Sequence, residues 1–132
     1  MSYDAAELAR QLAQLGLDLQ DEVAELGRLE EATVTAEGNY RHLNDLLEDA
    51  QASAFLRATG TNAEARKAEA RLACTDQRMA AEAGWKAWNK LKAEVRTQQA
   101  NLQAIHRRIE IGRSLLSREK SLLSLSSSGV DV

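Results

Sequence analysis

Residues 8–54 read LARQLAQLGLDLQDEVAELGRLEEATVTAEGNYRHLNDLLEDAQASA and carry a nearly unbroken seven-residue repeat of apolar side chains. Only Glu22 and Thr33 are polar among its 14 positions. A sustained repeat of this kind is typical of supercoiled helices and predicts an all-α protein. The repeat positions follow one another at spacings of four and three: Leu8, Leu12, Leu15, Leu19, Glu22, Leu26, Leu29, Thr33, Ala36, Tyr40, Leu43, Leu47, Ala50 and Ala54.

Glycines and capping residues predict where these helices end. Gly16 is expected to close a short first helix over about residues 3–15, and Asp18 to cap a second helix over 19–58. Gly27 and Gly38 would each cost that second helix roughly 1 kcal/mol relative to Ala, and would allow a bend or a close helix crossing.

The sequence Thr59-Gly60-Thr61 predicts the turn of a helical hairpin. Gly60 can adopt the left-handed conformation that ends a helix, and Thr61-x-x-Glu64 has the pattern of a capping box. A third helix is therefore expected over about 62–123, with a possible bend at Gly84. Its seven-residue repeat is made of small residues at first and of larger ones from Trp88 onward.

The predicted architecture is a single all-helical domain over residues 1–125, a long helical hairpin or coiled coil, followed by a flexible tail at 126–132. Two helices with narrow apolar seams leave surface that further copies would cover, so the pattern predicts a homo-oligomer. The residues expected in the oligomer seam are Leu26, Leu29, Leu43, Leu47, Leu91, Val95, Leu102, Ile105 and Ile109.

Composition excludes several classes of protein. The chain has 132 residues, no proline to interrupt long helices, and one cysteine, which cannot form a disulfide within the chain. No stretch approaches the roughly 20 apolar residues that span a bilayer, and the N-terminus lacks the pattern of a secretory leader. A cytoplasmic protein without a membrane partner is expected.

The net charge of −3 averages two unlike halves. Residues 1–60 carry 12 acidic and 4 basic side chains, whereas residues 61–132 carry 8 acidic and 13 basic ones. Such polarity can pair the two halves, can present a basic surface to a polyanion, or can be ordinary solvated charge on helix exteriors. Charge by itself does not decide among the three.

The sequence shows no catalytic or metal-binding constellation. His42 and His106 have no carboxylate or cysteine partner at a diagnostic spacing, and Cys74 falls on the small-residue seam, where a buried thiol fills space. No zinc spacing and no glycine-rich phosphate loop occurs. We expect a protein that is not an enzyme and has no cofactor.

Three groups of basic residues are candidates for binding phosphate. One flanks the predicted turn, a second interleaves cations with Trp85 and Trp88, and a third lies late in the chain. An exposed tryptophan near cations can stack a base, and Trp85 is the more open candidate because Trp88 falls on the repeat. The candidate nucleic-acid-binding residues are Arg57, Arg66, Lys67, Arg71, Lys86, Lys90, Arg107 and Arg108.

The order of these features resembles a known family. An acidic heptad helix, a glycine-containing hairpin and a long helix ending in Leu102-Gln103-Ala104-Ile105-His106-Arg107-Arg108 are similar to the phage recombination mediators of the UvsY type. The resemblance covers most of residues 17–120 by layout, and its sequence motif is short.

The resemblance implies a specific function. Such mediators form ring-like homo-oligomers, bind single-stranded DNA, and contact both a single-strand-binding protein and a RecA-like recombinase, which they help to load. Leu102, Ala104 and Ile105 would be packing residues and Arg108 a surface cation. The family places basic residues just before the hairpin glycine, whereas this chain has Gln51, Ala52 and Ser53 there, so the DNA contact would move to Arg66, Lys67 and Arg71.

Two other functions fit the same pattern. A coiled-coil scaffold or adaptor whose basic half pairs with an acidic partner needs the same heptads. A small helical toxin or secreted effector has less support, because no export feature is visible.

Overall fold

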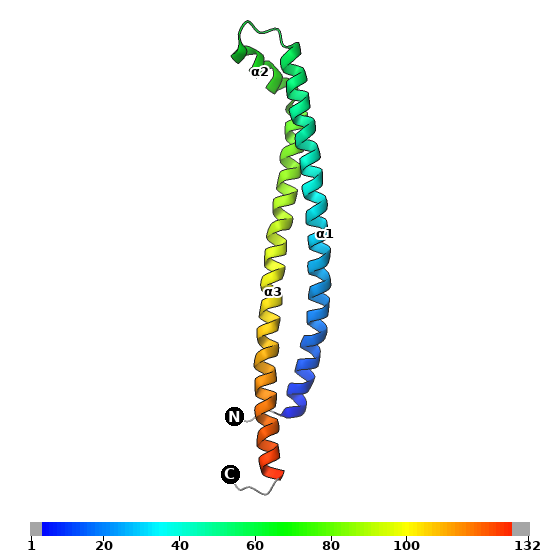
Figure 1. Ribbon diagram of the computed structural model, residues 1–132, viewed down its shortest axis with the longest axis vertical. Coiled ribbons are helices and arrows are strands. Elements are labelled where there is room, and N and C mark those ends of the chain that lie inside the picture. Colours follow the sequence, from blue (N-terminus) through cyan, green and yellow to red (C-terminus); the bar gives the residue numbers. More distant parts are fainter. Residues whose placement is uncertain (1–3, 128–132) are drawn as a thin grey trace. The chain divides into compact units, whose positions relative to one another are not determined.

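The computed structural model describes residues 4–127 and is helical throughout, apart from the connections. It contains three helices, α1 (Ala5–Arg57), α2 (Ala63–Ala73) and α3 (Thr75–Ser127), and no strand among the described residues (Figure 1). The all-α fold predicted from the heptad repeat is confirmed. Of the predicted tail at 126–132, residues 128–132 lie outside the described part of the chain, and α3 extends to Ser127.

The predicted break after a short N-terminal helix is wrong, because α1 continues through Gly16 without interruption. Asp18 does not cap a helix; its carboxylate accepts a hydrogen bond from the Gln14 amide, 2.9 Å away and one turn earlier. The roughly 1 kcal/mol that a glycine costs a helix is smaller than the gain from burying the leucines of a continuous seam on both sides of it.

The connection after α1 also differs from the prediction. Asn62, with extended backbone (φ −141°, ψ 171°), is the N-cap of α2, and its side-chain oxygen accepts the Ala65 amide at 2.8 Å. The predicted Thr61–Glu64 capping box is therefore wrong: Asn62 is the cap, and Ala65, three residues later, has no side chain that could complete a box. Gly60 is not in the left-handed region; a Cβ there would lie 2.8 Å from Ala65 Cβ and 3.0 Å from the Arg66 amide nitrogen, so glycine is required for close packing.

The third predicted helix is two helices that meet at Cys74. This residue leaves the helical region (φ −107°, ψ 23°), and its amide donates to the carbonyls of Ala70 and Arg71. The Thr75 hydroxyl donates to the Leu72 carbonyl at 2.8 Å and so satisfies another carbonyl at the end of α2. Gly84, where a bend was expected, lies inside the continuous α3.

The chain divides into two compact units. Of the described residues, unit 1 comprises those up to 28 and from 96 onward, and unit 2 comprises residues 29–95. In each unit a segment of α1 packs against a segment of α3, and unit 2 also contains α2. The single domain predicted over 1–125 therefore consists of two such units.

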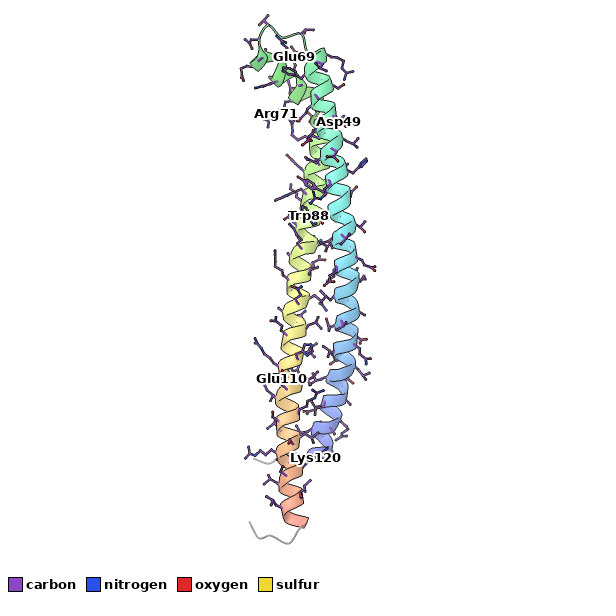
Figure 2. The ribbon with its side chains drawn as sticks, in the orientation of Figure 1. Asp49, Glu69, Arg71, Trp88, Glu110 and Lys120 are labelled. Carbon is purple, nitrogen blue, oxygen red and sulfur yellow. The ribbon has the colours of Figure 1, made fainter. Side chains whose placement is uncertain are left out.

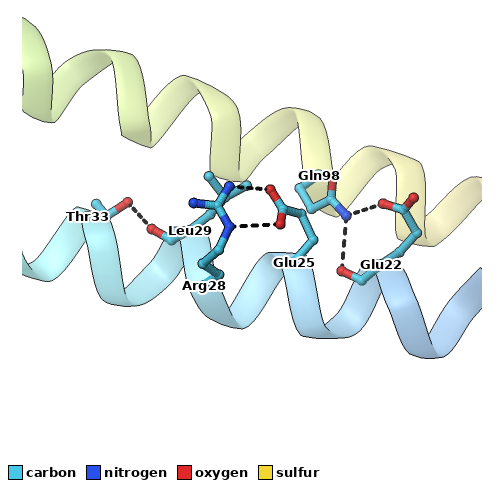
Figure 3. A network of polar contacts seen from close by, with 6 residues as sticks. All are labelled: Glu22, Glu25, Arg28, Leu29, Thr33 and Gln98. Atoms are coloured by element: carbon cyan, nitrogen blue, oxygen red, sulfur yellow. Dashed lines mark hydrogen bonds and ion pairs between the residues drawn. The ribbon is translucent and has the colours of Figure 1, made fainter.

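Unit 1 is held by one apolar contact zone and one polar pair. Leu8 and Ile109 are buried, and Leu12 fills the space left by Gly112, where a Cβ would lie 2.7 Å from Leu12 Cδ2. The buried Gln98 amide donates to the carboxylate of Glu22 and, at 3.0 Å, to its backbone carbonyl (Figure 3). A single polar pair inside an apolar seam favours one register, because any slip leaves buried polar groups unpaired.

Unit 2 is held by small residues at the α2–α3 junction and by aromatic stacking further along. Cys74 is 2% exposed, and Ala70 and Ala81 are also buried. Gly84 lets α1 approach closely, since a Cβ there would lie 3.1 Å from Leu43 Cδ1 and 3.5 Å from Tyr40 Cα. The small residues of the repeat before Trp88 therefore allow close packing of the helices in unit 2.

The residues predicted for the seam are withdrawn from solvent within a single chain. Leu29 and Ile109 are buried, and the other seven, Leu26, Leu43, Leu47, Leu91, Val95, Leu102 and Ile105, are half-buried. These side chains contribute to the packing inside each unit before any further copy is added.

No close helix crossing occurs at Gly27 or Gly38, the two glycines of α1 at which one was expected. Gly27 and Gly38 lie within a continuous helix, and a Cβ at either position would have nothing within 4 Å.

We therefore expect Gly38→Ala to raise the free energy of unfolding by up to about 1 kcal/mol, because Ala restricts the unfolded chain and favours the helix. Gly84→Val should instead lower the free energy of unfolding, because the added side-chain atoms would clash with Leu43 and Tyr40 of α1. Urea denaturation of both variants measures the difference, and a loss of stability in Gly38→Ala would contradict the expectation.

Candidate nucleic-acid interface

A cationic cavity lies at the α2–α3 junction of unit 2. Its volume is about 440 Å³. We call it the cationic notch; its lining residues are Gln51, Ala52 and Phe55 from α1, Lys67, Ala70 and Arg71 from α2, and Arg78 from α3. Because Lys67 and Arg71 are four residues apart on one helix, they share a face, and the helix break at Cys74 brings Arg78 to the same cavity.

Two of these cations have no acidic partner. Arg78 donates to the Arg71 carbonyl (3.3 Å) and to the Thr75 hydroxyl (3.5 Å), both neutral groups. In residues 4–127 no carboxylate lies within 4.0 Å of the guanidinium of Arg71 or Arg78. Lys67 reaches only to 4.0 Å from Glu64, and both side chains are well exposed, so that pair neutralises little charge. The notch therefore concentrates positive charge.

Three arginines of α1 are neutralised by glutamates on the same helix. Arg10 pairs with Glu7, and Arg28 with Glu25 (Figure 3). The hydrogen bond from Arg28 lowers the pKa of Glu25. Arg41 lies 2.7 Å from Glu37, whose hydrogen bond and charge raise the pKa of Arg41. In the notch, by contrast, three cations from α2 and α3 line one cavity, and two of them have no such pair within residues 4–127.

A second hollow adjoins the notch along α3 and shares Arg78 with it. Its volume is about 350 Å³. Trp85, which is 50% exposed, forms part of its wall together with Lys86. The remaining lining residues are Tyr40, Asn44, Leu47, Ala81 and Glu82. We call this cavity the tryptophan hollow.

The other tryptophan has a structural role. The ring of Trp88 stacks on Tyr40 with centroids 5.7 Å apart and planes at 23°, and Lys92 Nζ lies 3.9 Å from its centroid. Figure 2 shows Trp88 on α3 beside α1, whereas Arg71 projects from α2. Trp88 is half-buried on the repeat and Trp85 is more open, as the heptad pattern predicted.

The structure brings together only part of the predicted nucleic-acid-binding set. Lys67 and Arg71 line the notch and Lys86 the hollow, whereas Arg57 and Lys90 are exposed and line neither. The half-buried Arg66 has a buried Nε without a hydrogen-bond partner. Arg107 and Arg108 belong to the other unit.

Among the charged and aromatic residues of the notch, two were absent from the predicted set, Phe55 and Arg78. Arg78 follows Arg71 by seven residues, which would place both on one side of a continuous supercoiled helix. Because the helix break at Cys74 lies between them, that interval does not by itself predict that they share a cavity. The sequence holds no signal for Phe55 either, since its position depends on how α2 folds back beside α1.

Unit 1 carries an apolar groove of about 470 Å³. Leu8, Leu12, Leu15, Ile111, Gly112 and Leu115 form its apolar lining, and Gln11, Gln14, Asp18 and Arg108 complete it. Ile111 is 60% exposed, although it is a large aliphatic residue. Arg108, predicted as a DNA contact, thus lines an apolar groove.

The remaining chemistry-bearing residues form no site. His42 and His106 are exposed in different units, and Cys74 is a free, buried thiol. Among residues 4–127, no three His, Cys, Asp or Glu side chains gather where they could hold a metal ion. None of the described helices is both long and apolar enough to cross a membrane.

Comparison of the chain with protein-family models, with curated proteins and with solved structures finds no match.

Proposed function

We propose that this protein is a recombination mediator that binds single-stranded DNA as a homo-oligomer, without catalysing a reaction. The observation that carries the proposal is the cationic notch, in which Arg71 and Arg78 have no carboxylate partner. Unpaired guanidinium groups are strong donors to phosphate, and electrostatic contacts with the backbone supply most of the affinity in sequence-independent binding.

The surroundings of the notch favour a nucleotide over a bare anion. Phe55 lines the cavity beside the cations, and the adjoining hollow presents Trp85. Proteins that bind single strands without sequence preference combine a positively charged groove with aromatic faces on which bases stack. Both elements are present in unit 2.

For the assembly, we propose that the apolar groove of unit 1 is covered by a second copy of this chain. In this unit the α1 segment 5–28 carries five acidic and two basic residues, and the α3 segment 96–125 carries two acidic and six basic ones. An antiparallel pairing that sets α1 of one copy against α3 of another therefore joins opposite charges around an apolar centre. Repetition of the notch in an oligomer raises the effective concentration of binding sites along one strand.

The loading of a RecA-like recombinase onto DNA covered by a single-strand-binding protein is the part of the proposal that rests on the family resemblance. The predicted phage origin and the two protein partners rest on the same layout. An assay in which the protein relieves the block imposed by a single-strand-binding protein on recombinase ATP hydrolysis tests this part. Unchanged hydrolysis across a range of concentrations would refute it.

Titration of a fluorescently labelled single-stranded oligonucleotide at several salt concentrations tests the DNA-binding part. Log K should fall linearly with log salt, by roughly 0.7 for each phosphate contacted. A chain that engages the three notch cations would therefore show a slope near −2 or steeper. No change in anisotropy at low salt would refute the proposal.

A coiled-coil scaffold or adaptor is the second candidate. It is favoured by large apolar side chains exposed outside the groove, among them Val34 (70%), Leu56 (84%) and Leu72 (76%), which a protein partner could cover. On this alternative the notch cations bind no nucleic acid. Their replacement by glutamate is then expected to leave the assembly intact and to show no lost affinity for an oligonucleotide.

A further inference from the structure

A half-exposed tryptophan stands next to the unpaired cations of unit 2, and we infer that it is a base-stacking platform. Specifically, we propose that Trp85 receives an unpaired base in the tryptophan hollow and thereby makes the surface select single strands over duplex. This inference rests on the proposed nucleic-acid-binding function and deepens it, because it names the feature of the nucleic acid that is recognised.

The geometry places a phosphate site and a stacking site side by side. Arg78 lines both the notch and the hollow, and Trp85 follows it by seven residues on α3, about 10 Å along the helix axis. Lys86 lines the same hollow as Trp85. A strand whose phosphates contact Arg71 and Arg78 would thus bring a neighbouring base to the indole.

The packing of the chain does not account for the exposure of Trp85. The neighbouring Trp88 is the one that stacks on Tyr40 and lies under Lys92, whereas the ring of Trp85 makes no aromatic or cation–π contact with residues 4–125. Half of the Trp85 surface meets solvent. A large aromatic residue left open beside an aromatic-lined hollow is typical of a binding surface.

Stacking explains a preference for unpaired strands. Every base offers a π face, so stacking on an indole tolerates any sequence, but inside a duplex both faces of each base are already covered by neighbouring base pairs. Cations alone contact duplex and single-stranded phosphates alike. Selection for single strands therefore needs a group such as Trp85.

The test compares an ordinary single-stranded oligonucleotide with one of the same length made of abasic nucleotides, which keeps the phosphates and lacks the bases. Anisotropy is measured for the parent chain, for Trp85→Ala, and for the control Met79→Ala, which truncates another exposed apolar residue of α3 (62% exposed) that lines neither cavity. Circular dichroism checks that each variant remains helical.

The parent and Met79→Ala should bind the ordinary strand about tenfold to a hundredfold more tightly than the abasic strand, and Trp85→Ala should bind both about equally. Equal binding of the two strands by the parent would overturn the inference and leave phosphate binding by the notch intact. Retained discrimination in Trp85→Ala would also overturn it. Binding of neither strand would refute the proposed function, and the inference with it.

Discussion

Replacement of Lys67, Arg71 and Arg78 together by glutamate is expected to lower the affinity for a single-stranded oligonucleotide by about a hundredfold at 0.1 M salt. Each phosphate contact contributes roughly 0.7 to the slope of log K against log salt, which is about a factor of five at that concentration. Three contacts multiply to about a hundredfold, and the introduced negative charges add repulsion. The slope itself should become shallower by about 2.

The control makes the same change in net charge at arginines that are already paired. Arg10, Arg28 and Arg41 each lie beside a glutamate of the same helix, so their reversal to glutamate should weaken DNA binding far less. Anisotropy titrations of both triple variants, with circular dichroism to check helicity, make the comparison. Equal losses in the two variants would show that the notch is not the binding site and that only net charge matters.

Ile111→Glu is expected to reduce the assembled protein to single chains. The residue lines the apolar groove of unit 1, and a second copy covering that groove would bury the new carboxylate without a partner, at a cost of several kcal/mol for each interface. Light scattering should show the mass of one chain. The apparent affinity for a long single strand should fall by roughly 10²–10⁴, because the binding sites are no longer linked.

Leu17→Glu is the matched control for this prediction. Leu17 lies in the same unit and is exposed to a similar extent, 56% against 60% for Ile111, but it does not line the groove. The variant should keep the mass and the DNA affinity of the parent. A parent protein that is itself a single chain in solution would contradict the proposed assembly, and an assembled Ile111→Glu would exclude the groove as the interface.

The helical fold was predictable because the heptad repeat is a local property of the sequence. The repeat places Leu8, Leu29 and Ile109 on one face of their helices, and all three are buried in the structure. The repeat also predicts which tryptophan is more exposed. Trp88 lies on the repeat and is half-buried, whereas Trp85 lies off it and is exposed. Periodicity alone identifies which face of each helix is apolar.

The helix ends were less predictable, because the local preference of a residue to end a helix competes with the packing of that helix against others. Gly16 has the local character of a helix end, yet α1 continues through it, whereas Cys74 has no breaking character and ends α2. At Gly60 the sequence correctly indicated the end of a helix, but for the wrong reason. A left-handed backbone was expected, whereas glycine is needed there because a Cβ would clash with Ala65 and Arg66. Distances of this kind are set by packing.

The candidate site was predictable in its charge and not in its shape. Lys67 and Arg71 are four residues apart, so their common face follows from helix geometry alone. The cavity, however, needs Phe55 from α1 and Arg78 from α3 beside them. The sequence places these residues 12 and 7 positions away, across a loop and a helix break, and so does not bring them together.

By itself the sequence determined that this protein is helical, which faces of its helices are apolar, and that its basic residues gather in the second half of the chain. These properties follow from helix periodicity and from composition, which are local. Only the tertiary structure decided that α2 ends at Cys74, that Arg71 and Arg78 have no acidic partners, and that the cavity they line adjoins the one at Trp85. The physical reason is that charge neutralisation, exposure and cavities depend on which side chains from distant parts of the chain become neighbours.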